Sequence, residues 1–231
     1  MQKISRVAAM FSEIAEDYDR MNHLMTFHID SVWRRVLVRS LKLPEKAVVL
    51  DACTGTGDLA LALSGTAAVS RVYAADFSSA MLKRAKRKIV RRDPEKRIRL
   101  LECDVINLPF PDSRFDAVTM AFGLRNISDK FKCLQEFHRV VRKGGALRIL
   151  EFSPVPPGIL SSLMRLYVNL FIPLLGALVT GAYNAYQYLS RSIAGFYSPE
   201  KVIKTLRDAG WSKITCKRLF PGIAFLYLAE K

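Results

Sequence analysis

The sequence predicts an α/β fold: an open, Rossmann-like seven-stranded sheet with five parallel strands, a terminal hairpin and helices on both faces. Five short apolar or β-branched runs alternate with helical segments between residues 47 and 152, which is the pattern of a parallel sheet. Two further strand-like runs flank Pro221-Gly222 and predict the hairpin. The chain has 231 residues, of which 50% are hydrophobic; this suffices for one core of ordinary size and excludes a disordered chain.

The strand-like runs are separated by intervals that fit helices. The runs are AVVLDA, RVYAADF, IRLLECD, FDAVTMAF and ALRILEF, with SKITCKRLF and IAFLYLAEK near the C-terminus. Helices are expected over 58–64, 79–92 and 129–142, and another is expected to begin at Pro199 and end at Gly210. Lys143-Gly144-Gly145 predicts the turn into the fifth strand.

Helical segments precede the first strand and follow the fifth. Met10, Ile14, Tyr18, Met21 and Met25 recur at helical spacing and predict an amphipathic helix or helix pair. Prolines after Ser153 end the fifth strand, and a mostly apolar helical segment up to about residue 182 is expected before a helix over 186–196. We therefore expect a single domain over 1–231, with N-terminal helices over 1–45, a core over 46–153, a helical cap insertion over 154–198 whose helices lie within 155–197, and a terminal helix and hairpin over 199–231.

Charge and cysteine content narrow the class of protein. The 36 Lys and Arg residues exceed the 21 Asp and Glu residues, and a net charge of +15 attracts nucleic acid, anionic lipid or acidic substrates. The four cysteines are widely spaced, which predicts reduced thiols of a cytoplasmic protein and no disulfide framework. His23, His28 and His138 lack metal-ligand spacing, so no metal is expected and each should be a surface or cap residue.

No segment predicts secretion or a membrane span. The N-terminus MQKISRVAAMF lacks an apolar run of signal-peptide length. The most apolar stretch, residues 166–180, is shorter than the ~20 residues of a spanning helix. It also contains Asn169 and Pro173, so we expect a buried or interfacial helix.

A glycine-rich loop follows the first strand. It contains Asp51, Gly55, Thr56 and Gly57 and leads into a helix, so its backbone can turn sharply and approach a ligand closely. The second strand ends in Asp76, which can accept both ribose hydroxyls of an adenosine. The third strand ends in Asp104, beside which an adenine could stack or form a hydrogen bond. These positions predict an adenosine-binding site at one edge of the sheet.

Two cofactors fit this arrangement. Gly55-x-Gly57-x-x-Ala60 satisfies a loose dinucleotide pattern and keeps NAD as an alternative. Three features favour S-adenosylmethionine: Asp51 at the start of the loop, Asp104 after the third strand, and the terminal hairpin. Asp51 would face the methionine amine, a cation that a dinucleotide lacks. A glycine turn that binds no ligand would also give this pattern.

Longer segments resemble a known family, the C-methyltransferases of ubiquinone and menaquinone biosynthesis (the UbiE/MenG family). The segments are MFSEIAEDYDRMNHLMTF, VLDACTGTGDLA, ADFSSAMLKRA, LPFPDSRFDAVTMAFGLRNISD, GGALRILEFS and YQYLSRSIAGF. The resemblance runs from about Val7 to Lys231 and implies the class I S-adenosylmethionine-dependent methyltransferase fold. It also implies methyl transfer to a ring carbon of a polyprenylated hydroquinone, with demethylmenaquinol preferred over a benzoquinol.

The resemblance assigns cofactor contacts to particular positions. They are Thr56, Asp76 and Asp104, with Val105 as the neighbour of the adenine. The sequence departs from the family at Ala121, where the family often has Ser, so a side-chain contact to the cofactor is lost there. His28 and Asp30 stand where the family has Gly and His, and Lys143 replaces a Pro.

The expected chemistry needs a phenolate on the acceptor ring, because its adjacent carbon is then nucleophilic. We expect Arg125 to stabilise this phenolate and Asn126 to orient the ring oxygen or a water. Arginine is a poor base, so Tyr18 and Asp19 are the candidates to close over the ring and take the proton. The alternative for Arg125 is a structural salt bridge, for example to Asp129.

The expected partners are a polyprenylated hydroquinone and an anionic membrane surface. The apolar segment 159–179 predicts a greasy entrance or a lipid contact, with a packed cap as an equal alternative. Basic residues on the helix over 79–92 favour anionic lipid over a merely solvated face: Lys83, Arg84, Lys86, Arg87, Lys88, Arg91 and Arg92. We expect a cytoplasmic protein, peripheral on the inner face of the membrane; a homodimer or a quinone-biosynthesis complex stays open.

Proteins of the same fold can have other functions, which are the alternatives to quinone methylation. A nucleic-acid methyltransferase would explain the charge, but FGLRN follows the fourth strand where an Asn/Asp-Pro-Pro-aromatic motif would be needed, and no Pro-Cys pair exists. No nucleic-acid partner is therefore expected. The sequence also allows a methyltransferase that acts on a different small molecule, and a non-enzymatic module that binds adenosyl ligands or quinones.

Overall fold

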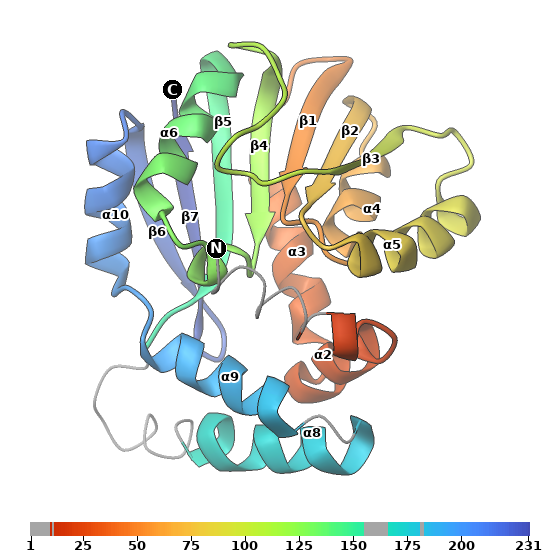
Figure 1. Cartoon of the computed structure of the whole chain (residues 1–231). Coiled ribbons are helices and arrows are strands. Elements are labelled where there is room, and N and C mark those ends of the chain that lie inside the picture. Colours follow the sequence, from red (N-terminus) through yellow and green to blue (C-terminus); the bar gives the residue numbers. More distant parts are fainter. Residues whose placement is uncertain (1–9, 11, 155–165, 181–182) are drawn as a thin grey trace.

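The computed structural model describes residues 10, 12–154, 166–180 and 183–231 and contains a seven-stranded sheet of order β3-β2-β1-β4-β5-β7-β6 (Figure 1). The strands are β1 (Ala47–Ala52), β2 (Val69–Asp76), β3 (Ile98–Glu102), β4 (Phe115–Ala121), β5 (Val141–Phe152), β6 (Ser212–Leu219) and β7 (Ala224–Glu230). β1 to β5 pair in parallel, and β7 pairs antiparallel with β5 and β6. The predicted fold class is confirmed.

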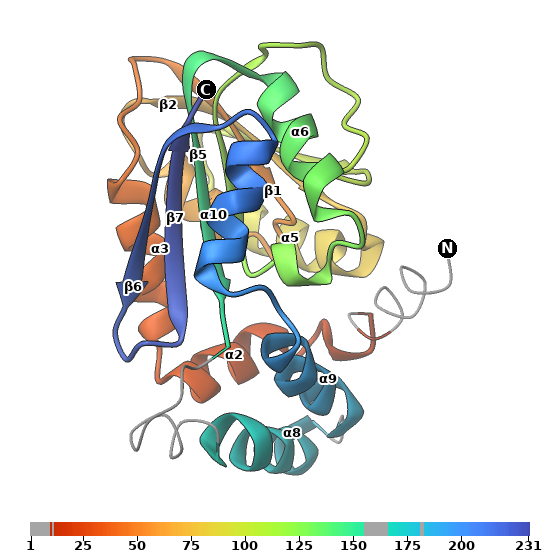
Figure 2. The same cartoon turned by 90° about the vertical axis from the view of Figure 1, so that its left-hand side faces the viewer.

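Two helical layers bury the faces of this sheet, as an all-parallel core requires. On one face lie α3 (Ile29–Arg39), α4 (Asp58–Ser64) and α5 (Ser79–Arg92), which bury Trp33, Leu63 and Ile89 in one apolar cluster. On the other face lie α6 (Lys130–Val140) and α10 (Pro199–Asp208), which bury Phe137 and Leu206 in a second cluster. Figure 2 shows α3 on one side of the sheet and α6 and α10 on the other.

A third layer lies beyond the carboxyl ends of the parallel strands (Figure 1). It contains α2 (Tyr18–Thr26), the π-helical turn η2 (Tyr167–Phe171), α8 (Ile172–Thr180) and α9 (Tyr183–Ala194). The Tyr167 hydroxyl donates to the Met25 carbonyl oxygen at 2.7 Å and ties η2 to α2. A side chain at Gly176 would lie 2.1 Å from Tyr186, so glycine at this position lets α8 approach α9 closely. The third layer therefore covers the carboxyl edge of the sheet, where the predicted site lies.

Some predicted boundaries were wrong. Lys143-Gly144-Gly145 lies inside β5 rather than before it, because the Gly144 N–H donates to the Lys231 carbonyl and the Lys231 N–H to Gly145, both at 3.0 Å. The helix expected over 129–142 ends at Val140, and the one expected over 186–196 is α9, which starts and ends earlier. Predictions for residues 1–9, 11, 155–165, 181 and 182 lie outside the described residues.

The apolar segment 166–180 forms η2 and α8. Within the described part of the chain, every helix falls short of the length and apolar character that crossing a bilayer demands. The segment presents large apolar side chains to solvent, among them Leu170, Leu174 and Leu178.

Candidate active site

Three cavities meet beneath the third layer. The largest has a volume of about 350 Å³ and lies between the sheet edge and α2, α8 and α9; the others have volumes of about 80 and 30 Å³ and lie at the loops after β1, β2 and β4. The large cavity is lined mostly by apolar and aromatic side chains, including Trp33, Phe122, Phe152, Ile172, Leu189 and Ile193. Tyr18 lines all three cavities and stands at their junction. The apolar cavity thus adjoins the two smaller cavities at Tyr18, and it also shares Phe122 with one and Arg34 with the other.

The glycine loop after β1 opens toward the two smaller cavities. Gly55 lines both, has φ +56°, and has open space where a Cβ would stand. Gly57 has φ +86° and caps α4, and a Cβ there would lie 3.3 Å from the Ala85 Cβ on α5. Gly55 therefore gives a ligand access to the backbone, whereas Gly57 allows α4 and α5 to pack.

Asp51 is buried at the end of β1 and lines the smallest cavity. Its carboxylate accepts hydrogen bonds from the Thr54 hydroxyl at 2.6 Å and the Thr119 hydroxyl at 3.1 Å. Burial raises the pKa of Asp51 to about 7, and no ion pair with it occurs among the described residues. A buried carboxyl of this kind fits a ligand that brings its own cation, as the methionine ammonium group would.

Asp76 and Asp104 both line the cavity of about 80 Å³. Asp76 is buried and accepts from the Gly55 N–H at 2.8 Å and the Ser78 N–H at 2.9 Å, while burial raises its pKa. Asp104 is exposed and accepts from the Ile106 N–H at 3.1 Å. These carboxyl groups lie where ribose and adenine contacts were predicted.

Val105, the predicted neighbour of the adenine, is a core residue. Its side chain is 3% exposed and packs in the core with α6, and the side chain of Ile106 lines the cavity instead. The turn after β3 therefore directs Val105 inward and Ile106 toward the cavity.

Arg125 lies in the short 3-10 turn η1 (Leu124–Asn126) after β4 and lines the large cavity. Its Nη1 lies 2.8 Å from Oε1 of Glu151, and its backbone N–H donates to Oε2 of Glu151 at 3.0 Å. The ion pair given as the structural alternative for Arg125 is therefore present, but its partner is Glu151 and not the suggested Asp129, whose carboxylate caps α6 by accepting from the Lys132 N–H at 2.9 Å. Asn126 lines the cavity of about 80 Å³ and accepts from the Tyr188 hydroxyl at 3.1 Å.

The structure separates the two residues expected to close over the ring. Burial raises the pKa of Tyr18, which lines the large cavity, against the opposing influence of Arg125. Asp19 is bound elsewhere: it accepts from the Thr56 hydroxyl and from the Lys88 ammonium group, the latter at 2.7 Å. Asp19 lines none of the three described cavities and lies against the glycine loop.

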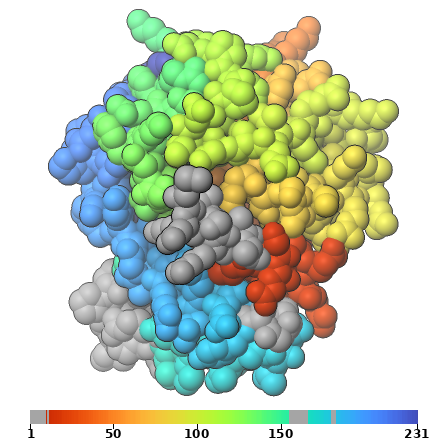
Figure 3. Space-filling view, in the orientation of Figure 1, coloured from red at the N-terminus to blue at the C-terminus, as the bar shows by residue number. Residues whose placement is uncertain are grey.

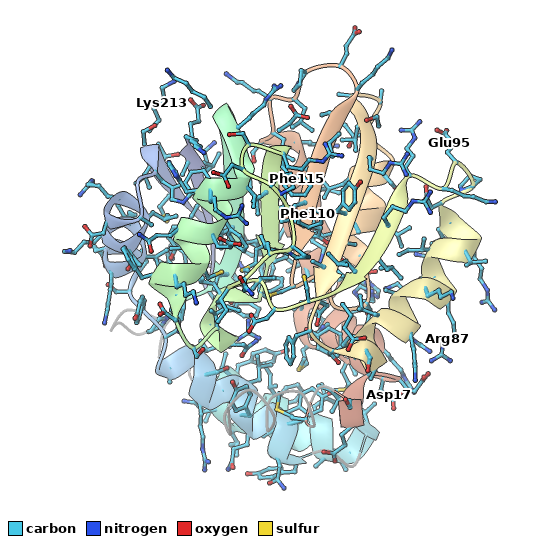
Figure 4. The ribbon with its side chains drawn as sticks, turned by 45° about the horizontal axis from the view of Figure 1, so that its top comes forward. Asp17, Arg87, Glu95, Phe110, Phe115 and Lys213 are labelled. Carbon is cyan, nitrogen blue, oxygen red and sulfur yellow. The ribbon has the colours of Figure 1, made fainter. Side chains whose placement is uncertain are left out.

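The contact between Asp19 and α5 belongs to a larger clamp. Glu16 forms ion pairs with Arg84 and Arg87, and Lys88 also lies 2.5 Å from Asp58 at the start of α4. Figure 4 labels Asp17 and Arg87 at the side of the molecule where the N-terminal segment meets α5, and Figure 3 shows that segment in red against the yellow helix. The clamp holds Tyr18 over the three cavities.

Sequence reasoning missed three charged residues at or near the large cavity: Asp30 and Arg34 line it, and Glu151 pairs with Arg125, which lines it. Glu151 lies within a run interpreted as an apolar strand, so its partnership with Arg125 left no signal in the sequence. Asp30 and Arg34 form an i,i+4 pair in α3 at 2.5 Å, a spacing that could have indicated them. Nδ1 of His23 lies 3.1 Å from Asp30, so His23 is bound rather than a plain surface residue.

The histidines do not gather into a metal site. The rings of His23 and His28 stack at 4.7 Å, and His138 packs against Trp211 at 5.3 Å. Over the residues that the structure describes, no three His, Cys, Asp or Glu side chains are placed to hold a metal ion.

Comparison with known proteins gives one consistent result. The model of the ubiE/COQ5 methyltransferase family matches residues 1–231. A demethylmenaquinone methyltransferase of Thermus thermophilus is 43% identical over 96% of this chain and 100% of its own length. A ubiquinone/menaquinone biosynthesis C-methyltransferase UbiE of Geotalea uraniireducens is 35% identical over 100% of this chain and 98% of its own.

Solved structures agree on the fold. A SAM-dependent methyltransferase from Aquifex aeolicus superposes with a TM-score of 0.59 at 23% identity, covering 85% of this chain and 88% of that one. A phosphoethanolamine N-methyltransferase 2 of Haemonchus contortus gives a TM-score of 0.65 at 15% identity, covering 86% of this chain and 52% of that one. At these identities the likeness concerns the fold alone.

Proposed function

The chain belongs to the ubiE/COQ5 methyltransferase family, and we propose that it methylates a ring carbon of a polyprenylated hydroquinone with S-adenosylmethionine as donor. The observation that supports this most directly is the junction at Tyr18, where a polar pocket with buried carboxyl groups adjoins an apolar cavity of about 350 Å³. Such an arrangement fits a charged nucleoside on one side and a greasy aromatic ring on the other.

The polar side has the groups that this donor needs. Asp51 would face the ammonium group, and Asp76 and Asp104 would accept hydrogen bonds from the ribose and the adenine. Thr56 would contact the carboxylate end from the loop. When bound, the sulfonium supplies an activated methyl group, so this chain's residues have only to orient the acceptor and manage its proton.

The apolar side has one pair of cations above a hydrophobic wall. Arg34 and Arg125 line the large cavity, and each guanidinium lies 5.6 Å from an aromatic centroid, Phe122 and Phe152 respectively. A cation at this position lowers the pKa of a ring hydroxyl and stabilises the phenolate that makes the adjacent carbon nucleophilic. Asn126 would orient that oxygen, and Tyr18 would hold the ring in line with the methyl group.

The acceptor favoured is a demethylated naphthoquinol. The Thermus thermophilus relative is named for demethylmenaquinone, and the Geotalea uraniireducens relative for ubiquinone and menaquinone. The mostly apolar lining of the large cavity disfavours a nucleic acid as the acceptor, since a polyanion needs cationic and polar contacts.

The test is mass spectrometry of the quinones of a strain from which the gene has been deleted. Accumulation of a demethylated menaquinone, reversed by the intact gene, would establish the naphthoquinol. A demethylated ubiquinone precursor would instead name the benzoquinol. An unchanged quinone pool would refute the proposal.

We further propose that the third layer rests on the inner face of the cytoplasmic membrane. Leu170, Phe171, Leu174 and Leu178 are each about half exposed or more, and they adjoin residues that line the large cavity. Contact with lipid would let an isoprenoid tail enter without crossing water. Arg84, Arg87 and Lys88 form ion pairs with acidic residues of the clamp. The remaining basic residues of α5 would therefore make the expected contact with anionic lipid: Lys83, Lys86, Arg91 and Arg92.

A further inference from the structure

The proposed reaction must dispose of a proton, and the cavity offers little to receive it. Methyl transfer forms a carbon–carbon bond, breaks the sulfonium carbon–sulfur bond and replaces a ring hydrogen. The ring hydroxyl loses its proton before the attack; afterwards the ring carbon loses its hydrogen as a proton while the oxygen is protonated again. The net yield is one proton per turnover, which has to leave an apolar cavity.

The groups around the large cavity leave one natural acceptor. Arg34 and Arg125 are cations and accept no proton. Burial raises the pKa values of Tyr18, Tyr167 and Tyr188, so these phenols are neutral and donate rather than accept. Asp30 is the one carboxyl group among the described residues that line this cavity.

The Asp30 carboxylate accepts hydrogen bonds from its neighbours and contacts His23, which reaches solvent. Its Oδ2 lies 2.5 Å from Arg34 Nη1, and its Oδ1 lies 2.9 Å from the Thr26 hydroxyl and 3.1 Å from His23 Nδ1. Asp30 is 2% exposed, whereas the His23 side chain is 27% exposed. The pair therefore spans from the cavity wall to solvent.

We propose that Asp30 and His23 form the route by which the proton leaves the acceptor ring. The hydroxyl proton passes to the Asp30 carboxylate and on to Nδ1 of neutral His23, and the resulting imidazolium releases a proton to water from Nε2. Arg34 keeps Asp30 ionised between turnovers, as the lowered pKa of Asp30 indicates. His28 stacks on His23, and further charged or titratable groups line the same cavity as Asp30: Arg125, Tyr18, Tyr167, Tyr186 and Tyr188.

This inference rests on the proposed function, so the assay measures methyl transfer itself and the effect of the relay variants on it. The full-length protein is assayed with S-adenosylmethionine and a chemically reduced demethylnaphthoquinol with a short isoprenoid tail at a series of pH values. His23→Gln should lower kcat about tenfold and change the dependence of kcat on pH, because the proton no longer leaves through an imidazole. Asp30→Asn should lower kcat about 10²-fold, the usual scale for losing a proton acceptor.

The matched control is His28→Asn. His28 stacks on the ring of His23 and does not line the large cavity, and its φ of +60° suits asparagine. This control should keep the wild-type pH profile, and adenosylhomocysteine should bind all variants equally in calorimetry. A wild-type profile in His23→Gln would overturn the relay while leaving the proposed function intact, whereas a wild type without methyl transfer would overturn both. Because Asp30→Asn also removes the charge that Arg34 pairs with, His23→Gln is the decisive variant.

Discussion

Glu151 holds the guanidinium of Arg125 against the rim of the large cavity. The Nη1–Oε1 distance is 2.8 Å, Glu151 is fully buried and Arg125 is 5% exposed. The Phe122 carbonyl accepts from the same Nη1 at 2.6 Å, and Ser192 Oγ accepts from Nε at 3.3 Å. Nη2 has no such partner within the described residues, and it is the nitrogen left for a ring oxygen.

The first prediction concerns this pair. Arg125→Ala should lower kcat by about 10²–10³-fold, the scale for removing one group that stabilises a developing oxyanion, with cofactor affinity unchanged. Glu151→Gln should lower kcat less, because the guanidinium stays charged but loses its fixed orientation. Steady-state kinetics and calorimetry check this, with Arg142→Ala, an exposed arginine paired with Asp116, as the control. Full turnover in Arg125→Ala would remove Arg125 from the mechanism.

The second prediction concerns Asp51, whose pKa burial raises to about 7. A cationic ligand binds the ionised carboxylate, so protons compete with it. Affinity for adenosylhomocysteine should therefore be constant above about pH 7 and fall by up to about tenfold per pH unit below it. Asp51→Asn should lose about 10–100-fold in affinity and this pH dependence.

Methylthioadenosine provides the control for Asp51, since it lacks the ammonium group. Its affinity should vary little between acid and neutral pH. Calorimetry that gave the same pH dependence for both ligands would show that Asp51 does not face the ammonium group.

The sequence was sufficient to predict which segments form strands and helices and in what order they follow one another. Apolar runs separated by helical periodicity predicted the bounds of β1, α4 and α5, since burial on both faces leaves a clear pattern. The acids at the ends of β1 and β2 were also predicted at the cavities where they occur. These features depend on local pattern and on the edge at which parallel strands end.

The partners of individual side chains could not be predicted from local sequence patterns. Arg125 pairs with Glu151 on the neighbouring strand rather than with Asp129 nearby in sequence, because the buried carboxylate is closer in space. Asp19 is drawn to Lys88 by a fold contact between segments 69 residues apart. Whether Val105 or Ile106 faces the cavity depends on one turn, which spacing cannot resolve.

The third prediction compares two glycines with positive φ. Gly57→Ala strains the backbone and brings a methyl group to 3.3 Å from Ala85, whereas Gly144→Ala strains the backbone in open space. Gly144→Ala should lower the free energy of unfolding by about 1–2 kcal/mol, and Gly57→Ala should lower it more. Urea denaturation measures both. Equal losses would mean that the α4–α5 contact contributes nothing.

The fourth prediction concerns the clamp. Lys88→Met removes the cation that joins Asp19 to Asp58, so the N-terminal segment should open more often. Hydrogen exchange at the amides of residues 18–26 should become faster, and the affinity for adenosylhomocysteine should fall. Lys83→Met, an exposed lysine on the same helix, should leave both unchanged. Exchange that was equally slow in both variants would contradict a clamp at Lys88.

The last prediction concerns the membrane. Leu170, Leu174 and Leu178 are 53%, 49% and 85% exposed, and taking a leucine side chain from water into an apolar phase is worth about 1.5–3 kcal/mol. Replacing all three by Ser should weaken binding to vesicles with anionic lipid by on the order of 10²-fold or more. Val90→Ser is the matched control, because Val90 is 75% exposed on α5, outside the third layer. Equal sedimentation of both variants with vesicles would exclude the third layer as the lipid contact, and binding that did not depend on anionic lipid would exclude the basic residues from it.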